Sequence, residues 1–491
     1  MASPHGISLR HESESVVFGR RARFARHLYL DDARMIEATP AGSRETRDNE
    51  TRGGRAPTIF ALATGAGRAA IAVMRVSGGG CGAILTRMLG EPPSPRRAVL
   101  RKLWRNAATQ NDHLDDALVL WFPGPSSYTG EDSFELHLHA GPAIISAVAD
   151  ALVAEGARPA EPGEFTRRAF LNGRVDLVEA EGVADLIEAE TEAQRRQALA
   201  QTDGRLSALY HEWADRLRSV LARQEALIDF PDEDLPPEVE DALISDITTL
   251  REEIAEHLAD GARGERIRRG LSFSIVGPPN AGKSSLLNWL AERDAAIVSP
   301  IAGTTRDAIE VAVVLAGVKV TLVDTAGIRE TSDPIEAEGV RRAMFHVEHS
   351  DCVVQIFASD APPDTETTPL PDAIVVCNKI DLAPAPARLG EISVSGVSVR
   401  TGQGLDDLRE TLERKALALT SGSGAPPLTR ARHRAAADEV YAALSAALAQ
   451  PWAEMRGEEL RLAMRSLGRL TGEVGVEDIL DTVFGQFCIG K

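Results

Sequence analysis

The chain has 491 residues, and 54 Lys and Arg against 73 Asp and Glu give it a formal net charge of −19 at pH 7. That length suggests about three domains, and 43% hydrophobic with 26% charged residues excludes wholesale disorder. No stretch approaches the roughly 18 unbroken apolar residues of a membrane-spanning helix, which excludes channels and transporters. The acidic balance argues against a protein that coats nucleic acid by bulk charge, although it is compatible with a local basic patch.

Cysteine usage and the first 56 residues bear on where the protein works. The four cysteines form no C-x-x-C pair, which argues against a disulfide framework or zinc knuckle and favours a reducing, cytosolic setting. Residues 1–56 carry ten Arg, no Lys and eight acidic residues. They are open to three interpretations: a flexible tail, an over-extended gene start or an organellar transit peptide. Transit peptides are poor in acidic residues, which counts against the third interpretation, and we leave this leader unassigned.

Alternating apolar residues predict three strands in the next part of the chain. They cover residues 71–76, 117–122 and 134–138. Gly141-Pro142 then begins an amphipathic helix. Short strands interspersed with helices indicate an α+β domain, which we place at residues 57–172.

The pattern then becomes helical, is interrupted by an α/β pattern, and resumes near the C-terminus. Residues spaced by three or four share one predicted helix face; they are Leu206, Leu209, Trp213, Leu217 and Val220. Prolines near residue 231 divide this part into at least two long helices. We therefore expect an all-α helical domain built from residues 173–267 and 421–491, with an α/β P-loop domain at 268–420 inserted into it.

The strongest functional signal is a phosphate-binding loop. Residues 277–284 read G-x-x-x-x-G-K-S, with an apolar strand before them and helical residues after them. Glycines let backbone N–H groups approach phosphates, Lys283 would reach the terminal phosphates, and the Ser284 hydroxyl would bind Mg²⁺. The expected nucleotide contacts here are Asn280, Ala281, Gly282, Lys283, Ser284 and Ser285.

Two further loops come after predicted strands, and their residues indicate which nucleotide binds. Asp324-Thr325-Ala326-Gly327 supplies an acid for the magnesium shell and a glycine N–H for the terminal phosphate. Asn378-Lys379-Ile380-Asp381 supplies a carboxylate that can accept two hydrogen bonds from the guanine edge. Ser398 belongs to a loop that would back the base. The sequence therefore predicts GTP, rather than ATP, as the ligand.

Hydrolysis must proceed without the glutamine that comes after the D-x-x-G loop in Ras-like enzymes, because Ile328 and Arg329 stand there. An arginine finger or a monovalent cation could supply the missing positive charge. Oxygen ligands for a cation are available from Asn280 and from residues 299–305, although Asn280 could instead only stabilise its loop. Thr305 would complete the Mg²⁺ shell. The expected contacts of this segment are Ser299, Pro300, Ile301, Ala302, Gly303, Thr304 and Thr305.

These motifs resemble those of a known family. The segments 277–288, 302–307 and 324–327 are similar to the potassium-dependent GTPases of the TrmE-Era-EngA-like group. Three flanking motifs resemble the MnmE (TrmE) family of tRNA-modification enzymes within that group; they are Ser127–Asp132, Pro162–Gly173 and Phe487–Lys491. The resemblance covers the chain from about residue 57 to its end.

The resemblance implies a role for the amino-terminal domain. Such domains bind formyl- or methylene-tetrahydrofolate and mediate dimerisation. The positions that would contact the folate are Arg75, Glu135, Arg174 and Lys491. Family members usually have lysine at the third position, and arginine keeps the charge with a different donor geometry.

The resemblance also implies how hydrolysis is assisted. Potassium would be bound by the Asn280 side chain and by Ser299, Ile301 and Thr304. Glu336 would position the hydrolytic water through a bridging water, with Glu338 as the alternative on chemistry alone. Cys488 matches a family cysteine that is needed for modification and not for GTP hydrolysis.

Partners are implied by the same resemblance. A homodimer, formed constantly through the amino-terminal domains and transiently through the GTPase domains, would join an FAD-containing MnmG-like protein as a heterotetramer in the cytoplasm. Together they would add an aminomethyl or carboxymethylaminomethyl group to the wobble uridine of certain tRNAs, while GTP hydrolysis drives a conformational cycle. The rival functions are a GTPase switch for ribosome assembly and the cytosolic part of a metal-ion transporter.

Overall fold

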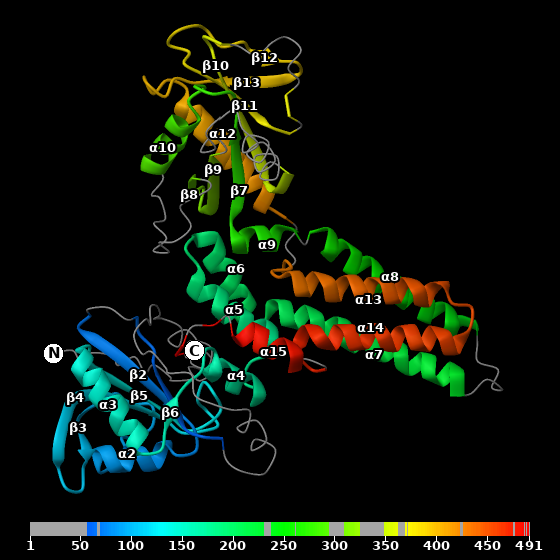
Figure 1. Cartoon of the computed structure of the whole chain (residues 1–491). Helices are drawn as coiled ribbons and strands as arrows, with labels where there is room; N and C mark the ends of the chain where they lie inside the picture. The colour runs from blue at the N-terminus through cyan, green and yellow to red at the C-terminus, as the bar shows by residue number, and fades with distance from the viewer. Residues whose placement is uncertain are drawn as a thin grey trace, which may run out of the picture. The chain divides into compact units, whose positions relative to one another are not determined.

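The computed structural model describes residues 56–65, 69–229, 237–260, 262–293, 309–324, 348–361, 369–370, 372–422, 426–474, 477–485, 487 and 489–490. These residues form two compact units, one within residues 1–187 and 476–491 and the other within 188–475. Figure 1 traces the chain through both units. The expected combination of an α+β domain, a helical domain and an α/β P-loop domain is confirmed. In this described part, no helix is both long and apolar enough to span a membrane.

The first unit is built on a six-stranded sheet with the order β3-β4-β5-β2-β1-β6, antiparallel except for the β1–β6 pair. Its strands are β1 (Ile59–Leu62), β2 (Ile71–Ser77), β3 (Val99–Asn106), β4 (Asn111–Phe122), β5 (Ser133–His139) and β6 (Arg158–Pro159). The three predicted strands are confirmed, but β4 begins at Asn111 rather than at residue 117. Five of the first six residues of β4 are polar, and most of them are exposed, so hydrophobic alternation could not reveal this part of the strand.

Helices cover one face of this sheet and extend the unit. They are α2 (Cys81–Leu89), α3 (Pro142–Ala154), α4 (Glu164–Leu171), α5 (Leu177–Glu188) and α15 (Glu477–Phe484). Inward-facing residues of α2 and α3, such as Ile84 and Leu152, pack with Leu136 of β5 in one core. The C-terminal helix α15 packs Phe484 against Leu177 of α5, so the two ends of the chain contribute to one unit.

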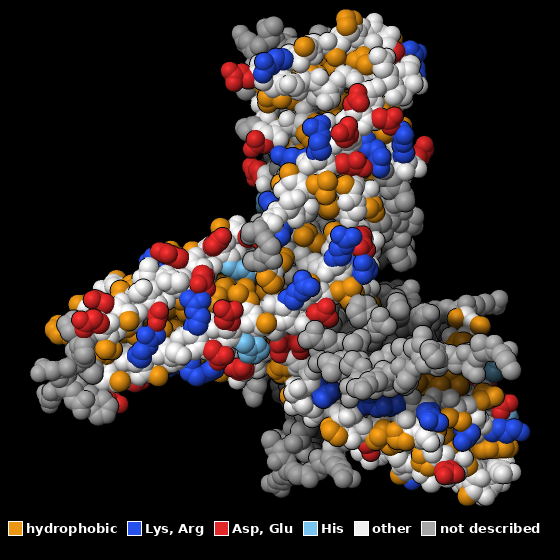
Figure 2. All heavy atoms as spheres, turned by 180° about the vertical axis from the view of Figure 1, so that it is seen from behind, with side chains coloured by type: hydrophobic (Ala, Val, Ile, Leu, Met, Phe, Trp, Pro, Cys, Tyr) orange, Lys and Arg blue, Asp and Glu red, His pale blue; other side chains and the backbone are white. Residues whose placement is uncertain are grey.

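The second unit contains a bundle of long helices from both sides of the inserted domain. Its helices are α6 (Glu192–Thr202), α7 (Arg205–Asp229), α8 (Pro237–Ala259), α9 (Ala262–Arg269), α13 (Ala431–Ala449) and α14 (Ala453–Thr471). Gln224 of α7 donates to the carbonyl of Ala453 at 3.0 Å, and Arg456 of α14 pairs with Glu240 of α8 at 2.9 Å. The two helical halves therefore pack together. On the face drawn in Figure 2, acidic and basic side chains are interspersed along this bundle.

The inserted domain has a seven-stranded sheet with the order β12-β13-β11-β10-β7-β9-β8. The strands are β7 (Leu271–Val276), β8 (Ile309–Leu315), β9 (Val318–Asp324), β10 (Cys352–Ala358), β11 (Ile374–Asn378), β12 (Arg388–Leu389) and β13 (Ile392–Gly396), with helices α10 (Lys283–Arg293) and α12 (Leu405–Thr420). The central strands are parallel and buried, which explains their continuous apolar runs. Parallel strands bring their carboxyl ends to one edge, where the predicted nucleotide loops begin.

A buried carboxylate joins the inserted domain to helix α9. Asp351, at the start of β10, accepts hydrogen bonds at 2.9 Å from Arg266 Nε and Arg269 of α9. Its second oxygen accepts from the Ser272 amide of β7 at 3.0 Å, and the Asp351 amide donates back to the Ser272 carbonyl at 2.8 Å. One side chain thus links the helix that enters the domain to two strands of its sheet.

Candidate functional site

The loop between β7 and α10 has the close-packed backbone of a phosphate cradle. A Cβ at Gly277 would lie 1.9 Å from the Ile356 carbonyl oxygen, and one at Gly282 would lie 2.1 Å from the Asn378 amide nitrogen. Gly282 has φ +99°, and Asn280 has the left-handed φ of +60°. Only glycine fits at residues 277 and 282, so this motif is explained by its backbone path as well as by its ligand.

The charged and polar groups of the loop converge at the start of α10. The nearly buried Lys283 donates through Nζ to the carbonyls of Gly277 at 2.7 Å and Pro278 at 2.9 Å. The Ser284 hydroxyl donates to Asp324 Oδ2 at 2.7 Å, although residues 284 and 324 are far apart in sequence. A hydroxyl and a buried carboxylate at a helix N-terminus are suitable ligands for Mg²⁺ beside phosphates.

The predicted base-reading residues form one hydrogen-bonded group. Asn378 donates to the Ala281 carbonyl at 2.9 Å and accepts from the Val399 amide at 3.2 Å, so it joins the phosphate loop to the loop behind the base. The buried Ser398 hydroxyl donates to Asp381 Oδ1 at 2.6 Å. This hydrogen bond, with a further contribution from Arg400, holds the pKa of Asp381 below its ordinary value. Asp381 is therefore an anionic acceptor at neutral pH.

A second group of polar residues lies in the first unit, on the sheet face opposite α2 and α3. Arg75 of β2 and Glu135 of β5 are cross-strand neighbours, and their side chains pair at 3.0 Å. The guanidinium lies 5.8 Å from the ring centroid of Tyr128 and 5.9 Å from that of Phe165. Burial opposes ionisation of Glu135, but the nearby His137 side chain and the paired Arg75 outweigh it and lower its pKa. The arginine is thus held by one carboxylate and two aromatic rings.

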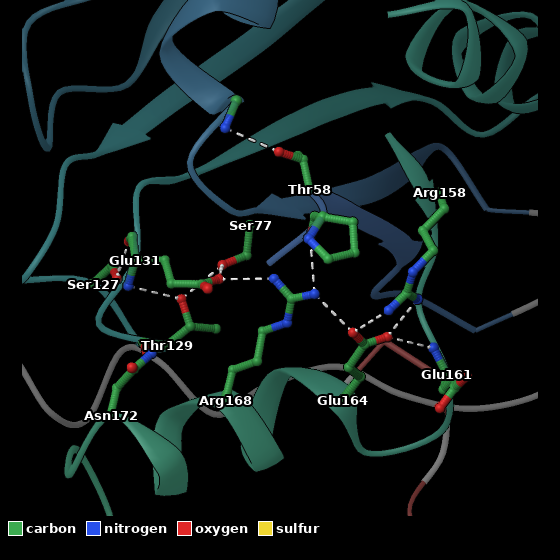
Figure 3. Close-up of polar contacts among 12 residues, drawn as sticks. Thr58, Ser77, Ser127, Thr129, Glu131, Arg158, Glu161, Glu164, Arg168 and Asn172 are labelled. Atoms are coloured by element: carbon green, nitrogen blue, oxygen red, sulfur yellow. Dashed lines mark hydrogen bonds and ion pairs between the residues drawn. The ribbon is translucent and has the colours of Figure 1, made fainter. Parts of the chain in front are cut away.

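A partly buried ion-pair network lies in the elements that carry those rings, and Figure 3 draws its residues without the rings. Arg168 of α4 donates to Glu131 at 3.0 Å, to Glu164 at 2.8 Å and to the Pro57 carbonyl at 2.9 Å. Arg158 adds two bonds to the other side of Glu164, at 2.7 and 2.8 Å. The network joins the loop that carries Tyr128, the helix that carries Phe165, and the segment that leads into β1.

Comparison with known proteins matches both units. A model of the GTP-binding protein TrmE N-terminus matches residues 58–174, and a model of the MnmE helical domain matches residues 177–488. A protein named tRNA modification GTPase MnmE from Gluconacetobacter diazotrophicus is 69% identical over 434 residues, which are 88% of this chain and 98% of that protein. The chain belongs to the MnmE family.

Other members of the MnmE family are similar over the same share of this chain. A tRNA modification GTPase MnmE from Rhodospirillum rubrum is 50% identical over 88% of this chain and 99% of its own length. Among solved structures, the G domain of the T. maritima FeoB iron transporter is 24% identical, covers 31% of this chain and 99% of that chain, and has a TM-score of 0.23.

Several residues that the motifs or the family resemblance singled out lie outside the described part of the structure. They are Ser299, Pro300, Ile301, Ala302, Gly303, Thr304, Thr305, Thr325, Ala326, Gly327, Glu336, Glu338, Cys488 and Lys491. Their assigned roles stay predictions. Gly490, next to Lys491, is described: a Cβ added there would lie 2.5 Å from the Leu62 carbonyl oxygen of β1.

The remaining predicted folate contact is an exposed arginine. A Cβ added at Gly130 would lie 3.2 Å from Cγ of Arg174, so the arginine stem runs along the loop that carries Tyr128. Sequence reasoning singled out this loop and helix α4 as family motifs without assigning roles to Tyr128, Phe165 or Arg168. Only membership of these motifs could have pointed to the three residues, because no spacing rule links two aromatic rings to an arginine on a distant strand.

The histidines and cysteines of the described residues provide no metal site. His137 contacts Glu135 at 3.7 Å, while His139 pairs with the buried Asp115 at 2.7 Å. Burial raises the pKa values of Cys352 and Cys377 to about 11, so both thiols stay protonated at neutral pH. Both cysteines lie in apolar core clusters, where they pack as small apolar side chains.

Proposed function

We propose that this chain is a potassium-activated GTP hydrolase that acts in the modification of the tRNA wobble uridine. One observation carries the proposal: a guanine-nucleotide site and the Arg75–Glu135 group occur in one chain of the MnmE family. A ribosome-assembly switch would need only the first of these sites. We also propose three domains. They are an amino-terminal domain at residues 57–172, a GTPase domain at residues 268–420, and a helical domain made of residues 173–267 and 421–491.

Each of the described side chains has a separate role in binding the nucleotide. Asp381 reads the guanine edge, and Lys283 places a positive charge beside the phosphates. Ser284 and Asp324 would hold Mg²⁺, with Thr305 as a further ligand, and the bound ion would neutralise charge on the phosphate oxygens. Glu336 would position the attacking water. Hydrolysis of GTP would drive domain movement rather than the modification chemistry itself.

Potassium is proposed to supply the positive charge that an arginine finger supplies in other GTPases. Asn280 is exposed on the phosphate loop in a left-handed conformation, and its amide oxygen is a suitable ligand for an alkali ion. Ser299, Ile301 and Thr304 would complete the site.

GTP hydrolysis is expected to be about tenfold or more faster in KCl than in NaCl at equal ionic strength, because a bound cation stabilises charge that develops in the transition state. Asn280→Ala should remove most of that difference, as measured by phosphate release at saturating GTP. Equal rates in the two salts would contradict the potassium site.

We propose that the first unit binds a formyl- or methylene-tetrahydrofolate near Arg75 and Glu135, with Arg174 and Lys491 as further contacts. On the same sheet face, Ile71 is 58% exposed and Leu100 is 67% exposed. These two exposed apolar side chains, on a face that also carries Arg75 and Glu135, support a homodimer in which two copies of this face meet.

Arg75→Ala is expected to weaken 5-formyltetrahydrofolate binding about 10- to 100-fold, because a hydrogen bond from a charged group contributes about 1.5–3 kcal/mol. GTP hydrolysis should be unchanged. Titration calorimetry would measure binding, with Arg101→Ala as the control, because Arg101 is an exposed arginine of the same sheet that bonds only to its neighbour's carbonyl among the described residues. Binding as tight as that of the unsubstituted protein would exclude Arg75 from the site.

The tRNA reaction is proposed to need an FAD-containing MnmG-like partner in a cytoplasmic heterotetramer. The net charge of −19 supports this division, because the partner would then supply much of the basic surface for tRNA. Mass analysis of tRNA nucleosides from a strain that lacks this gene, with and without the gene restored, tests the function. Unchanged wobble uridines in the deletion strain would refute it.

A further inference from the structure

The carboxylate that reads guanine already has two donors on it. Ser398 donates to Asp381 Oδ1 at 2.6 Å, and Arg400 pairs with Oδ2 of the same side chain. The two donors differ in setting: Ser398 is fully buried, whereas the Arg400 side chain is 72% exposed. Ser398 is fixed by its loop, since its hydroxyl also accepts from the Thr401 amide at 3.2 Å and its own amide donates to the Gln403 carbonyl at 2.9 Å.

Guanine requires the oxygen that Arg400 holds. Its ring N–H and its exocyclic amino group are two parallel donors, and each needs one oxygen of Asp381. A carboxylate oxygen has two lone-pair positions, so the single bond from Ser398 leaves Oδ1 able to accept another. Oδ2 has a second lone-pair position as well, but Arg400 occupies the first with a planar group that carries only donors, so its N–H groups would repel those of the base at that oxygen. Donors of the base and of the arginine would then meet at one oxygen.

We propose that Arg400 competes with the guanine base for Asp381 and thereby sets how tightly GTP and GDP are held. The inference rests on the proposed nucleotide site. An arginine with a largely exposed side chain can leave the carboxylate at small cost, so it weakens binding without preventing it. Release of GDP between rounds of hydrolysis is accelerated by the same competition, because Arg400 takes the oxygen as the base departs.

The exposure of the pair determines the expected size of the effect. Ion pairs at such positions contribute about 0.2–1 kcal/mol, which corresponds to roughly a 1.5- to 5-fold change in an equilibrium constant. Because exposed charges are screened by salt, the effect should be largest at low ionic strength.

The experiment measures dissociation of GDP that carries a fluorescent methylanthraniloyl group from the full-length protein, after a chase with unlabelled GDP. Potassium and magnesium are kept constant while choline chloride is varied. Arg400→Ala should release the nucleotide about 1.5- to 5-fold more slowly than the unsubstituted protein at low salt, with a matching fall in Kd. The difference should shrink at roughly 0.5 M added salt.

Two variants separate this effect from a general change in the domain. Arg400→Lys keeps the charge and should lie between the unsubstituted protein and Arg400→Ala. Arg388→Ala removes an exposed arginine of β12 that bonds to the Glu391 carbonyl, and it should leave release unchanged. The inference would be overturned if Arg400→Ala released GDP faster than the unsubstituted protein. It would also be overturned if the two proteins released GDP at the same rate at both low and high salt. Failure of the unsubstituted protein to bind the labelled GDP would instead refute the proposed nucleotide site.

Discussion

Lys283→Ala is expected to lower the rate of GTP hydrolysis about 100- to 1,000-fold at saturating GTP, the usual loss when one charge-stabilising donor is removed. Lys283 is nearly buried at the N-terminus of α10, and its ammonium group is held over the loop by the carbonyls of Gly277 and Pro278. No reorganisation is then needed to present positive charge to the phosphates. Nucleotide affinity should also fall about 10- to 100-fold, because a charge-assisted hydrogen bond is lost.

Phosphate release over a range of GTP concentrations separates the two effects of this substitution. Lys415→Ala is the control, because it removes a lysine from helix α12 of the same domain, away from the phosphate loop. A Lys283→Ala protein that turns over GTP at nearly the normal rate would show that another group supplies the charge. The assignment of this loop as the catalytic phosphate site would then be wrong.

The inserted domain could be predicted from the sequence in most of its parts. Apolar parallel strands end in loops whose residue types are dictated by phosphate and base chemistry, so β7, β9 and β11 are recognisable by the loops at their carboxyl ends. The sequence indicated that the two helical parts belong to one domain, but it could not show how they pack together. That packing depends on contacts such as that of Gln224 with Ala453, which are separated by more than two hundred residues.

The first unit was harder to predict because its signals are weaker. Strand β3 mixes apolar and polar side chains without regular alternation, and the first half of β4 is mostly polar, so a period of two is obscured. Resemblance suggested Arg75 and Glu135, and the cross-strand register brings them into contact. The support of Arg75 by Tyr128 and Phe165 depends on tertiary packing, which short motifs do not encode.

The nucleotide loops also illustrate what short motifs omit. The N-K-x-D motif identified Asp381, and the loop of Ser398 was recognised only as a backing for the base. The contact between Arg400 and Asp381 is made by side chains on two different loops. Its consequence for nucleotide release becomes visible only when both loops are seen around one carboxylate.

Asp351→Ala is expected to destabilise the second unit by about 2–4 kcal/mol, which lowers its unfolding midpoint by roughly 5–10 °C. The carboxylate is 4% exposed and accepts hydrogen bonds from Arg266, Arg269 and the Ser272 amide. Removing it leaves the buried amide without its acceptor and two arginines without their shared anion. Because both arginines reach solvent in part, the loss should be smaller than for a fully buried pair.

Thermal unfolding followed by circular dichroism would measure this change, with Asp215→Ala as the matched control. Asp215 is an exposed aspartate of α7 that also pairs with an arginine, and its removal should cost less than about 0.5 kcal/mol. Asp351→Asn keeps the size of the side chain and part of its hydrogen bonding, so it should lie between these two variants. Equal midpoints for Asp351→Ala and Asp215→Ala would mean that α9 is held to the inserted domain by apolar packing rather than by this carboxylate.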